Sequence, residues 1–379
     1  MEKIRLALLT YTIDGRRAKG TAVVARKSVE AVLSRDEFDV TLLHFEKDDD
    51  EVYAGSAREV LFPRFRWGFL NFRSLRMLYY FLTTKDRYDI VHWYQPRVYP
   101  FFFLAPTKHT VATLHGAGDV TENRLRFVWS RAMFIWTLRY LGRFMSGVIA
   151  GSEFAKRDIV RRYGFAPERV HVVNNGVESV FAPQSAQAIA DVIKKYNLPE
   201  KFYMNVARLI PSKNVMRTFR AYELFREKNP DSDLKFVNIG TAGTERPAVD
   251  ALMNASRYRE DMQLVGYVDQ ADLPALYSSA FALVFPILNE GFGLPAVEAM
   301  ACGTPAVISD TAAPEMTPTD TYLVNALDEQ SIADAMHVLA NDPVRYAQLK
   351  SGGLAKAATY TWEISGEKII ALYREIMHK

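Results

Sequence analysis

The sequence has almost no cysteine and no apolar run long enough to cross a membrane. Cys302 is the single cysteine among 379 residues, which excludes an internal disulfide and a cysteine-rich metal site. This usage favours a cytoplasmic protein, in which Cys302 is a small buried residue of a helix. The first apolar run, IRLALLTY, is too short for a transmembrane helix and lacks a small-residue cleavage pattern. We therefore expect a first β-strand there and not a signal peptide.

Charge is unevenly distributed along the chain. Residues 1–180 contain 28 lysines and arginines against 20 acidic residues, whereas residues 181–379 contain 19 against 24. A basic N-terminal half favours an anionic partner, such as a phospholipid surface, a lipid phosphate or a nucleic acid. A basic face that is simply solvated explains the same counts, so charge alone does not choose between these interpretations.

Short apolar runs alternate with stretches of helical period along the whole sequence. Examples are FDVTLLHF, DIVHWY and GVIAGS in the first half, and LKFVNIG, FALVFPIL and PAVIS in the second. Such alternation predicts parallel sheets with right-handed crossovers, and 379 residues are too many for one ordinary core. We expect an α/β protein with two Rossmann-like, doubly wound domains that face each other across a cleft. Glycine, proline and serine gather at residues 174–186, where we place the linker.

The segment NEGFGLPAVEAMACGTP, residues 289–305, combines a glycine-rich turn with two glutamates. Pro295 stands where a helix would begin, and the unpaired amides of a helix start form an anion site. Glu298 lies about one turn into this helix, while Glu290 stays on the loop. A carboxylate beside a phosphate is repelled by it, so we expect the carboxylate to bind a different group of the ligand. An ionised carboxylate can accept hydrogen bonds from a pair of neighbouring sugar hydroxyls. Alternatively, Glu298 is a solvated residue on the helix surface and Glu290 a solvated residue in the turn. The presence of two glutamates at this spacing makes that alternative less favoured than a binding site.

This segment resembles the Glu-x7-Glu motif of retaining GT-B glycosyltransferases, and most closely that of family 4. The resemblance implies that Glu298 binds the ribose of a nucleotide and that Glu290 lies at the donor sugar. It implies an N-terminal acceptor-binding domain at 1–178 plus 360–379, and a nucleotide-sugar-binding domain at 179–359. It also implies that backbone amides face the transferred sugar and the diphosphate, namely those of Gly291, Phe292, Gly293 and Leu294.

Two further segments of the second half resemble the same family. NVARLIPSKN is similar to a Gly-Arg-x4-Lys-Asn segment that grips the diphosphate, which implies this role for Arg208 and Lys213, with an alanine in place of the usual glycine. Two cations would offset the charge that a leaving diphosphate gains, so no metal and no cofactor are expected. GYVDQADL resembles the segment beside the base, which implies that Tyr267 and Val268 form its wall.

The first half resembles the family more in pattern than in letters. ATLHGAGD is similar to the loop whose histidine lies near the anomeric centre, which implies a hydrogen bond from His115 to the donor and an acceptor contact by Asp119. The family's first glycine loop is reduced to Lys-Gly-Thr, which leaves Gly20 as the donor contact. No residue stands out as a covalent nucleophile, so the resemblance implies front-side substitution assisted by the leaving phosphate.

The resemblance therefore implies a retaining, metal-independent glycosyltransferase. It would move a hexose from a GDP- or UDP-linked sugar to a sugar or lipid-linked glycan, as in cell-surface polysaccharide, lipopolysaccharide or glycolipid synthesis. The Gly-Phe-Gly-Leu-Pro form favours a mannose- or rhamnose-type donor. The alternatives are a nucleotide-sugar epimerase, a phosphorylase, and a GT-B protein that binds a nucleotide sugar without transferring it.

Two stretches of the first half, residues 64–81 and 123–147, are basic and aromatic and contain no acidic residue. Arg131 and Arg139 bar a membrane span in the second. Helices there would either lie on an anionic membrane, at the inner face of the plasma membrane, or line a groove for a lipid-linked acceptor. Alternatively they pack on the sheet with their arginines reaching water. A nucleic-acid partner is not expected, because no nucleic-acid-binding module accompanies the arginines.

Overall fold

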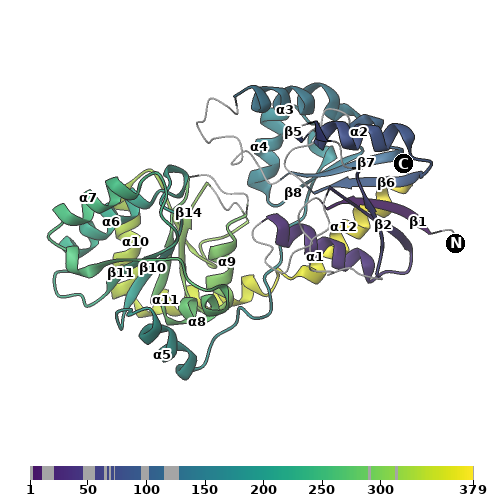
Figure 1. Ribbon diagram of the computed structural model, residues 1–379. Helices are drawn as coiled ribbons and strands as arrows, with labels where there is room; N and C mark the ends of the chain where they lie inside the picture. Colours follow the sequence, from purple (N-terminus) through teal and green to yellow (C-terminus); the bar gives the residue numbers. More distant parts are fainter. Residues whose placement is uncertain are drawn as a thin grey trace. The chain divides into compact units, whose positions relative to one another are not determined.

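The computed structural model describes residues 3–10, 21–45, 56–63, 66–67, 70–71, 73–94, 102–114, 128–288, 292–311 and 315–378. The chain divides into two units (Figure 1). Unit 1 combines Met1–Gly176 with Trp362–Lys379, and unit 2 is Val177–Thr361. The chain thus leaves unit 1, forms the whole of unit 2 and then returns. Each boundary lies two residues from the one expected from the sequence.

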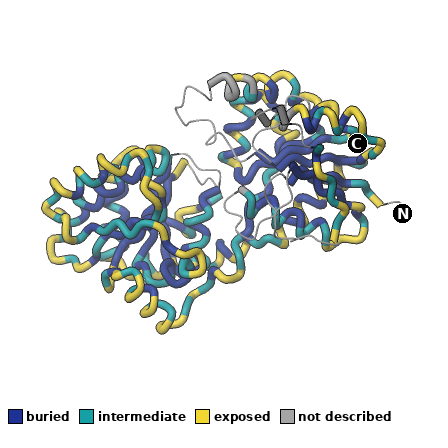
Figure 2. The backbone as a smooth tube through the Cα atoms, in the orientation of Figure 1, coloured by how far each residue is buried: buried dark blue, intermediate teal, exposed yellow. Residues whose placement is uncertain are grey.

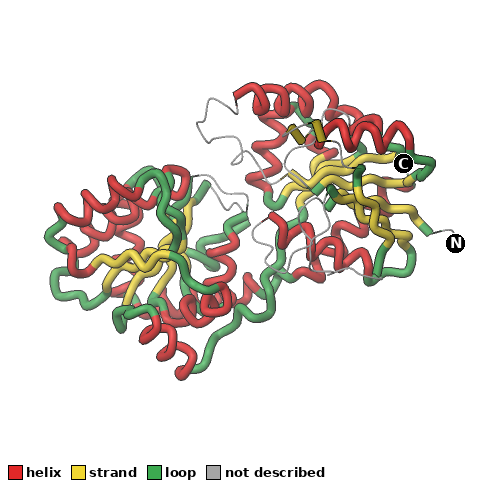
Figure 3. Tube along the Cα trace, in the orientation of Figure 1, coloured by secondary structure: helices red, strands yellow, loops and turns green. Residues whose placement is uncertain are grey.

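Unit 1 is built on a parallel sheet with the strand order β3-β2-β1-β6-β7-β8-β9. Its strands are β1 (Ile4–Leu9), β2 (Phe38–His44), β3 (Arg58–Leu61), β6 (Tyr88–Trp93), β7 (Thr107–Leu114), β8 (Gly147–Ala150) and β9 (Val170–Val172). Every residue of β6 and β8 is buried, because helices cover both faces of the sheet (Figure 3).

The helices of unit 1 form two layers. One face of the sheet is covered by α1 (Thr21–Leu33) and α12 (Trp362–Met377). The other is covered by α2 (Arg73–Thr83), α3 (Val128–Leu141) and α4 (Glu153–Tyr163). Figure 1 shows the two layers on opposite sides of the strands.

A buried polar network fixes α12 to the sheet. His92 on β6 shares hydrogen bonds with the hydroxyls of Tyr373 on α12, at 2.5 Å, and of Thr113 on β7, at 2.8 Å. Burial lowers the pKa of His92 to about 3, so its ring is neutral at physiological pH. A Cβ added at Gly366 would lie 2.5 Å from the Cβ of Ala31, so this glycine lets α12 approach α1 closely.

The stretch 64–81 differs from the helix that the sequence predicts. A short antiparallel hairpin of β4 (Arg66–Trp67) and β5 (Leu70–Asn71) occupies its beginning, and α2 follows. The edge strand β3 was also not expected, because half of its residues are exposed and it has no apolar run.

Arg76 on α2 is buried and supports neighbouring loops. Its guanidinium donates hydrogen bonds to the carbonyl oxygens of Phe45 and Phe62, each at 2.8 Å, and of Pro63 at 2.5 Å. This arginine therefore does not face water or a partner, in contrast to what the composition of the stretch suggests.

Unit 2 repeats the architecture with the strand order β12-β11-β10-β13-β14-β15. Its strands are β10 (Phe202–Val206), β11 (Lys235–Ile239), β12 (Met262–Gly266), β13 (Ala282–Phe285), β14 (Ala306–Ser309) and β15 (Tyr322–Val324). All these strands are parallel. From the centre of the sheet, β10, β11 and β12 follow one another towards one edge, and β13, β14 and β15 follow one another towards the other edge. The strand order therefore reverses between β10 and β13. Ligands of open α/β sheets bind at the carboxyl ends of the strands at such a reversal.

In both units the buried residues follow the strands (Figure 2). The helices of unit 2 also form two layers. One layer contains α6 (Val215–Lys228), α7 (Arg246–Ala255) and α10 (Glu329–Asn341). The other contains α5 (Ala186–Lys195), α8 (Leu273–Ser279), α9 (Leu294–Ala301) and α11 (Pro343–Ala357).

Candidate functional site

The loops that leave β10 and β13 are tied together at the reversal of strand order in unit 2. The buried side chain of Asn214 donates hydrogen bonds to the carbonyl oxygens of Pro286, at 2.8 Å, and Ala326, at 2.6 Å. The amide of Leu288 donates to the carbonyl oxygen of Ser212 at 3.1 Å. Asn214 has a φ of 57°, a left-handed conformation that asparagine tolerates better than most residues. The loops after β10, β13 and β15 are therefore held as one surface.

The two cations implied by the resemblance lie on the loop after β10. Lys213 ends a short 3₁₀ helix, η6 (Pro211–Lys213), and its Nζ lies 5.8 Å from the ring centroid of Phe285, the last residue of β13. Arg208 is exposed, and its Nε makes a long hydrogen bond of 3.4 Å to the carbonyl oxygen of Ala242. Positive charge thus stands at the carboxyl ends of the two central strands.

The loop after β11 packs tightly against the Arg208 loop. A Cβ added at Gly240 would lie 2.2 Å from the carbonyl oxygen of Ala207, and one added at Gly243 would lie 2.1 Å from that of Leu209. Only glycine permits such an approach at these two positions. Neither glycine is predicted as a site residue from the sequence, although Gly240 follows directly after an apolar strand.

Glu245, at the same loop, is also not predicted as a site residue from the sequence. It precedes α7, and its amide donates a 3.0 Å hydrogen bond to the carbonyl oxygen of Leu209. Its Oε2 is buried and has no hydrogen-bond partner among the described residues. Burial raises the pKa of this carboxyl, and the nearby charge of Arg217 opposes that change.

The helix start expected at residue 295 lies one residue earlier. α9 begins at Leu294, and its N-cap residue, Gly293, has a φ of 82° and makes no side-chain capping bond. Pro295 is therefore the second residue of α9. The amides at this start have no side-chain cap, as an anion site requires.

Glu298 lies one turn into α9, as the sequence predicts. Its Oε2 accepts a 2.9 Å hydrogen bond from the hydroxyl of Tyr277 on α8. Burial raises the pKa of Glu298 to about 7, the bond from Tyr277 opposes this, and the negative charge of Glu178 adds to it. The hydroxyl of Thr304 donates to the carbonyl oxygen of Tyr277 at 2.6 Å, so the segment that follows α9 holds this tyrosine in place.

The remaining described candidates differ in exposure. Phe292 is 5% exposed and its ring packs edge-on against Tyr360 at 5.1 Å, so its side chain belongs to the core of unit 2. Tyr267 and Val268 follow β12, and Tyr267 is 60% exposed whereas Val268 is 7% exposed. Of this pair, Tyr267 presents the larger surface to a ligand. The candidates that lie outside the described residues are Gly20, His115, Asp119, Glu290 and Gly291.

The structure thus brings the described candidates to neighbouring strands of one sheet. Arg208 and Lys213 follow β10, the start of α9 follows β13, and Tyr267 follows β12. All stand at carboxyl ends of strands in unit 2. Among the residues that the structure describes, no group of three acidic, histidine or cysteine side chains could hold a metal ion. No helix in the described part of the chain is both long and apolar enough to span a membrane.

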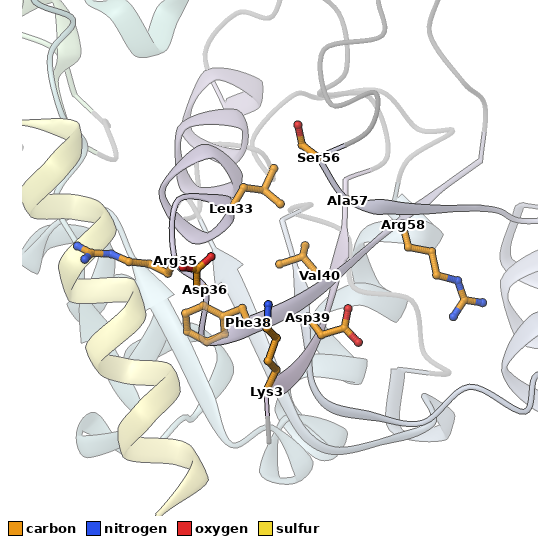
Figure 4. Close-up of a pocket in the computed structure, with 10 residues that line it drawn as sticks. All are labelled: Lys3, Leu33, Arg35, Asp36, Phe38, Asp39, Val40, Ser56, Ala57 and Arg58. Carbon is orange, nitrogen blue, oxygen red and sulfur yellow. The ribbon is translucent and has the colours of Figure 1, made fainter. Parts of the chain in front are cut away.

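A surface hollow of about 390 Å³ lies at the opposite, amino edge of the sheet of unit 1 (Figure 4). Residues of β2 and β3, and of the segments that precede the first three strands, line it, including Lys3, Phe38 and Asp39. Its arginines are engaged elsewhere, since Arg58 forms a two-bond ion pair with Asp86 at 2.9 and 3.0 Å. None of the residues that line this hollow belongs to the candidate site.

Two family models match the chain. The model described as glycosyl transferases group 1 matches residues 200–342, and the model described as glycosyltransferase family 4 matches residues 19–181. Together these matches take in most of both units.

The chain belongs to glycosyltransferase family 4.

Several curated relatives of this family 4 chain are glycosyltransferases. The serotype-specific mannosyltransferase WbdA of Escherichia coli is 29% identical over 57% of this chain and 27% of the relative. The O-antigen chain mannosyltransferase B of Escherichia coli is 29% identical over 60% of each. The D-inositol 3-phosphate glycosyltransferase of Salinispora tropica is 30% identical over 72% of this chain and 59% of the relative. The matches thus span between about a quarter and three fifths of these relatives.

Solved structures resemble the family 4 chain over its whole length. HepE of Anabaena, solved in complex with UDP and glucose, has a TM-score of 0.74 at 17% identity and covers 98% of this chain and 100% of its own. WaaG, a glycosyltransferase involved in lipopolysaccharide biosynthesis, has a TM-score of 0.68 at 14% identity, with 98% and 99% covered. At this identity the likeness establishes the fold alone, and it confirms the expected GT-B fold.

Proposed function

We propose that this chain is a retaining, metal-independent glycosyltransferase. It transfers a hexose from a nucleoside diphosphate sugar to a sugar or lipid-linked glycan, in the synthesis of a cell-surface polysaccharide or lipopolysaccharide. Family membership and the polysaccharide-related relatives support the reaction class. The observation that carries the proposal is the grouping of Lys213, Arg208, the uncapped start of α9 and Glu298 at the carboxyl ends of β10 and β13.

In this proposal unit 2 binds the donor. The diphosphate lies against the start of α9, where the positive end of the helix favours negative charge. Arg208 and Lys213 hold it from the loop after β10. Glu298 accepts hydrogen bonds from the ribose hydroxyls through Oε1, because its Oε2 is engaged by Tyr277. The exposed ring of Tyr267 lies against the base.

The chemical step is a front-side substitution. A hydroxyl of the acceptor attacks the anomeric carbon as the bond from that carbon to the diphosphate oxygen breaks, and the acceptor proton moves to the leaving diphosphate. Negative charge therefore grows on the diphosphate in the transition state, where Arg208 and Lys213 stabilise it most. His115 donates a hydrogen bond near the anomeric centre, Glu290 and Gly291 contact the donor sugar, Gly20 contacts the donor, and Asp119 contacts the acceptor.

The donor is a GDP- or UDP-linked hexose. The mannosyltransferase relatives support a mannose-type sugar, and the complex of HepE with UDP and glucose supports a uridine nucleotide. A thermal-shift panel of UDP, GDP, ADP and TDP with their sugar conjugates, with EDTA present, distinguishes the bases. A ligand at about 100 times its Kd raises the unfolding free energy by about 2.7 kcal/mol, which is readily measured.

The decisive experiment compares Lys213→Ala with Lys201→Ala, an exposed lysine of unit 2 paired with Asp233 away from the site. With the donor found in the panel and a glycan acceptor, we expect Lys213→Ala to lower kcat/KM by about 100-fold and the control to retain it. Equal activity of the two variants would contradict the proposed diphosphate site. Tight donor binding by the unaltered chain, with no nucleoside diphosphate released at any acceptor, would favour a binding protein without transferase activity.

A further inference from the structure

The outer surface of α2, α3 and two short 3₁₀ helices, η1 (Phe102–Leu104) and η4 (Gly142–Phe144), exposes large apolar side chains. Eight of the fourteen exposed large hydrophobic residues in the described part of the chain belong to these four elements. We call them the aromatic face. Its residues are Leu75, Tyr79, Leu82, Phe103, Leu104, Trp136, Tyr140 and Phe144.

The aromatic face is connected through direct contacts. α2 packs against η1, whose Phe103 ring lies 6.3 Å from the ring of Phe144 in η4. η4 directly follows α3, on which the rings of Trp136 and Tyr140 lie 5.4 Å apart. The buried sides of α2 and α3 pack on the same face of the sheet, so the exposed side chains point away from it. Patches of this kind on a folded protein mark interaction sites.

Positive charge lies within the aromatic face. Arg139 and Arg143 are exposed. Trp136, Arg139 and Tyr140 occupy positions i, i+3 and i+4 of α3 and form one stripe, and Arg143 lies in η4, which directly follows α3. The Arg143 guanidinium lies 5.0 Å from the ring centroid of Phe144. Residues 73–83, 102–104 and 128–144 contain no acidic residue, and neither arginine has an acidic partner among the described residues.

A stripe of Trp, Tyr and Arg matches the interface of an anionic bilayer. Trp and Tyr place their rings among acyl chains and their polar atoms among headgroups, while arginines reach the phosphates. A protein partner would need a surface complementary to side chains from four separate elements, whereas a bilayer needs only the exposed apolar area and the charge.

We propose that the aromatic face docks unit 1 on an anionic phospholipid surface. Tyr79, Leu82, Phe103, Trp136 and Phe144 enter the interface, and Arg139 and Arg143 contact lipid phosphates. Docking does not depend on the proposed transferase activity, because no residue of the face belongs to the candidate site.

The first test is cosedimentation of the full chain with phosphatidylcholine vesicles, with and without phosphatidylglycerol. We expect binding only to the anionic vesicles, with an affinity that falls as salt rises. Replacing both Arg139 and Arg143 by glutamine should weaken it by about ten- to thirty-fold. The charge-matched control replaces Arg246 and Arg259, exposed arginines of unit 2, by glutamine and should bind like the unaltered chain.

A second pair of variants tests the apolar contribution. Replacing Trp136 and Phe144 by serine should weaken binding by about ten-fold or more, whereas the same change at Leu327 and Val344, exposed residues of unit 2, should leave it unaltered. Urea unfolding followed by far-UV circular dichroism checks that each variant is folded. Equal binding by face and control variants, or no binding to anionic vesicles, would overturn the proposal. If the face variants instead dissociate a dimer and vesicle binding is unchanged, the face is an interface between copies of the chain and the proposal is wrong.

Discussion

The two units share a doubly wound architecture, yet their helical surfaces carry different chemistry. Ion pairs lie on helices of both units, such as Lys195 with Asp272 at 2.6 Å in unit 2 and Arg162 with Asp158 at 2.9 Å in unit 1. In unit 1, α3 exposes Trp136 beside Arg139, and neither has an acidic neighbour on its helix. A shared fold therefore leaves each surface able to acquire its own partner, and function has to be argued from strand ends and outer faces.

The buried polar residues differ between the units in the same way. In unit 1, His92 joins the sheet to α12 and lies within the core. In unit 2, Asn214 joins loops at the strand ends, beside Lys213. We infer that His92 serves the assembly of unit 1, whereas Asn214 serves the candidate site of unit 2.

The largest effect is expected for Asn214→Ala. The change leaves the carbonyl oxygens of Pro286 and Ala326 without their donor and places alanine in a left-handed conformation. We expect the unfolding free energy of unit 2 to fall by about 2–4 kcal/mol and nucleotide binding to weaken, as measured by urea unfolding and calorimetry. Asn214→Gly, which keeps the backbone conformation, should recover only part of the loss. Asn254→Ala, at an exposed asparagine, is the control, and an equal loss there would contradict the role of Asn214.

The second prediction is that the two units respond to pH in opposite directions. The pKa of Glu298 is raised from 4.5 to about 7, so the unfolding free energy of unit 2 falls as the pH rises from 4.5 to 7. The pKa of His92 is lowered from 6.5 to about 3, so the unfolding free energy of unit 1 falls as the pH drops from 6.5 towards 3. Glu298→Gln should reduce the pH-dependent change in the unfolding free energy of unit 2 by about 1–3 kcal/mol. His92→Gln should reduce that of unit 1 by a similar amount.

The sequence offers a separate probe for each unit. All five tryptophans belong to unit 1, so their fluorescence follows its unfolding. The single cysteine, Cys302, is buried in unit 2, so its alkylation rate follows that unit. Each variant is compared with the unaltered chain at pH 7 and pH 4.5. A Glu298→Gln variant whose pH dependence equals that of the unaltered chain would contradict the buried position of this carboxyl, and Glu260→Gln, at an exposed glutamate, supplies the control.

The smallest effect is expected for Tyr277→Phe. Loss of the hydroxyl removes a bond that lowers the pKa of Glu298, so this pKa should rise further. If ionised Glu298 binds the ribose, nucleotide affinity at pH 7 should fall by about two- to five-fold, and the acid limb of the binding profile should move to higher pH. Tyr203→Phe removes a hydroxyl that donates to the carbonyl oxygen of Met336 in the same unit. A shift of the acid limb in both variants would argue against a positioning role for Tyr277.

The order of strands and helices was predictable because most strands are continuous apolar runs. β13 ends at Phe285, as the sequence predicts, and its apolar residues are buried on both faces. The edge strand β3 was missed because exposed Arg58 and Leu61 give it no such run. The pairing of β4 with β5 was missed because arginines and aromatic residues at close spacing resemble an amphipathic helix.

The candidate site was predictable only where one segment holds several of its residues. Lys213 and Glu298 were predicted from their own segments. The structure places Lys213 after β10 and Glu298 one turn into α9, the helix that follows β13. Asn214, Gly240 and Glu245 were missed because each acts through contacts with loops distant in the sequence. Their residue types alone carry no signal of those partners. The roles of all site residues stay predictions, as do the cytoplasmic location and the independence from metal.

The return of α12 to unit 1 has a consequence for synthesis of the chain. Ribosomes make the protein from its N-terminus, so the strands of unit 1 emerge well before the helix that covers one of their faces. Ile369, Leu372 and Tyr373 complete that face only after the whole of unit 2 has been translated. Unit 2, whose residues are continuous, can fold first and hold the two segments of unit 1 within reach of each other. The N-terminal unit is therefore expected to finish folding last.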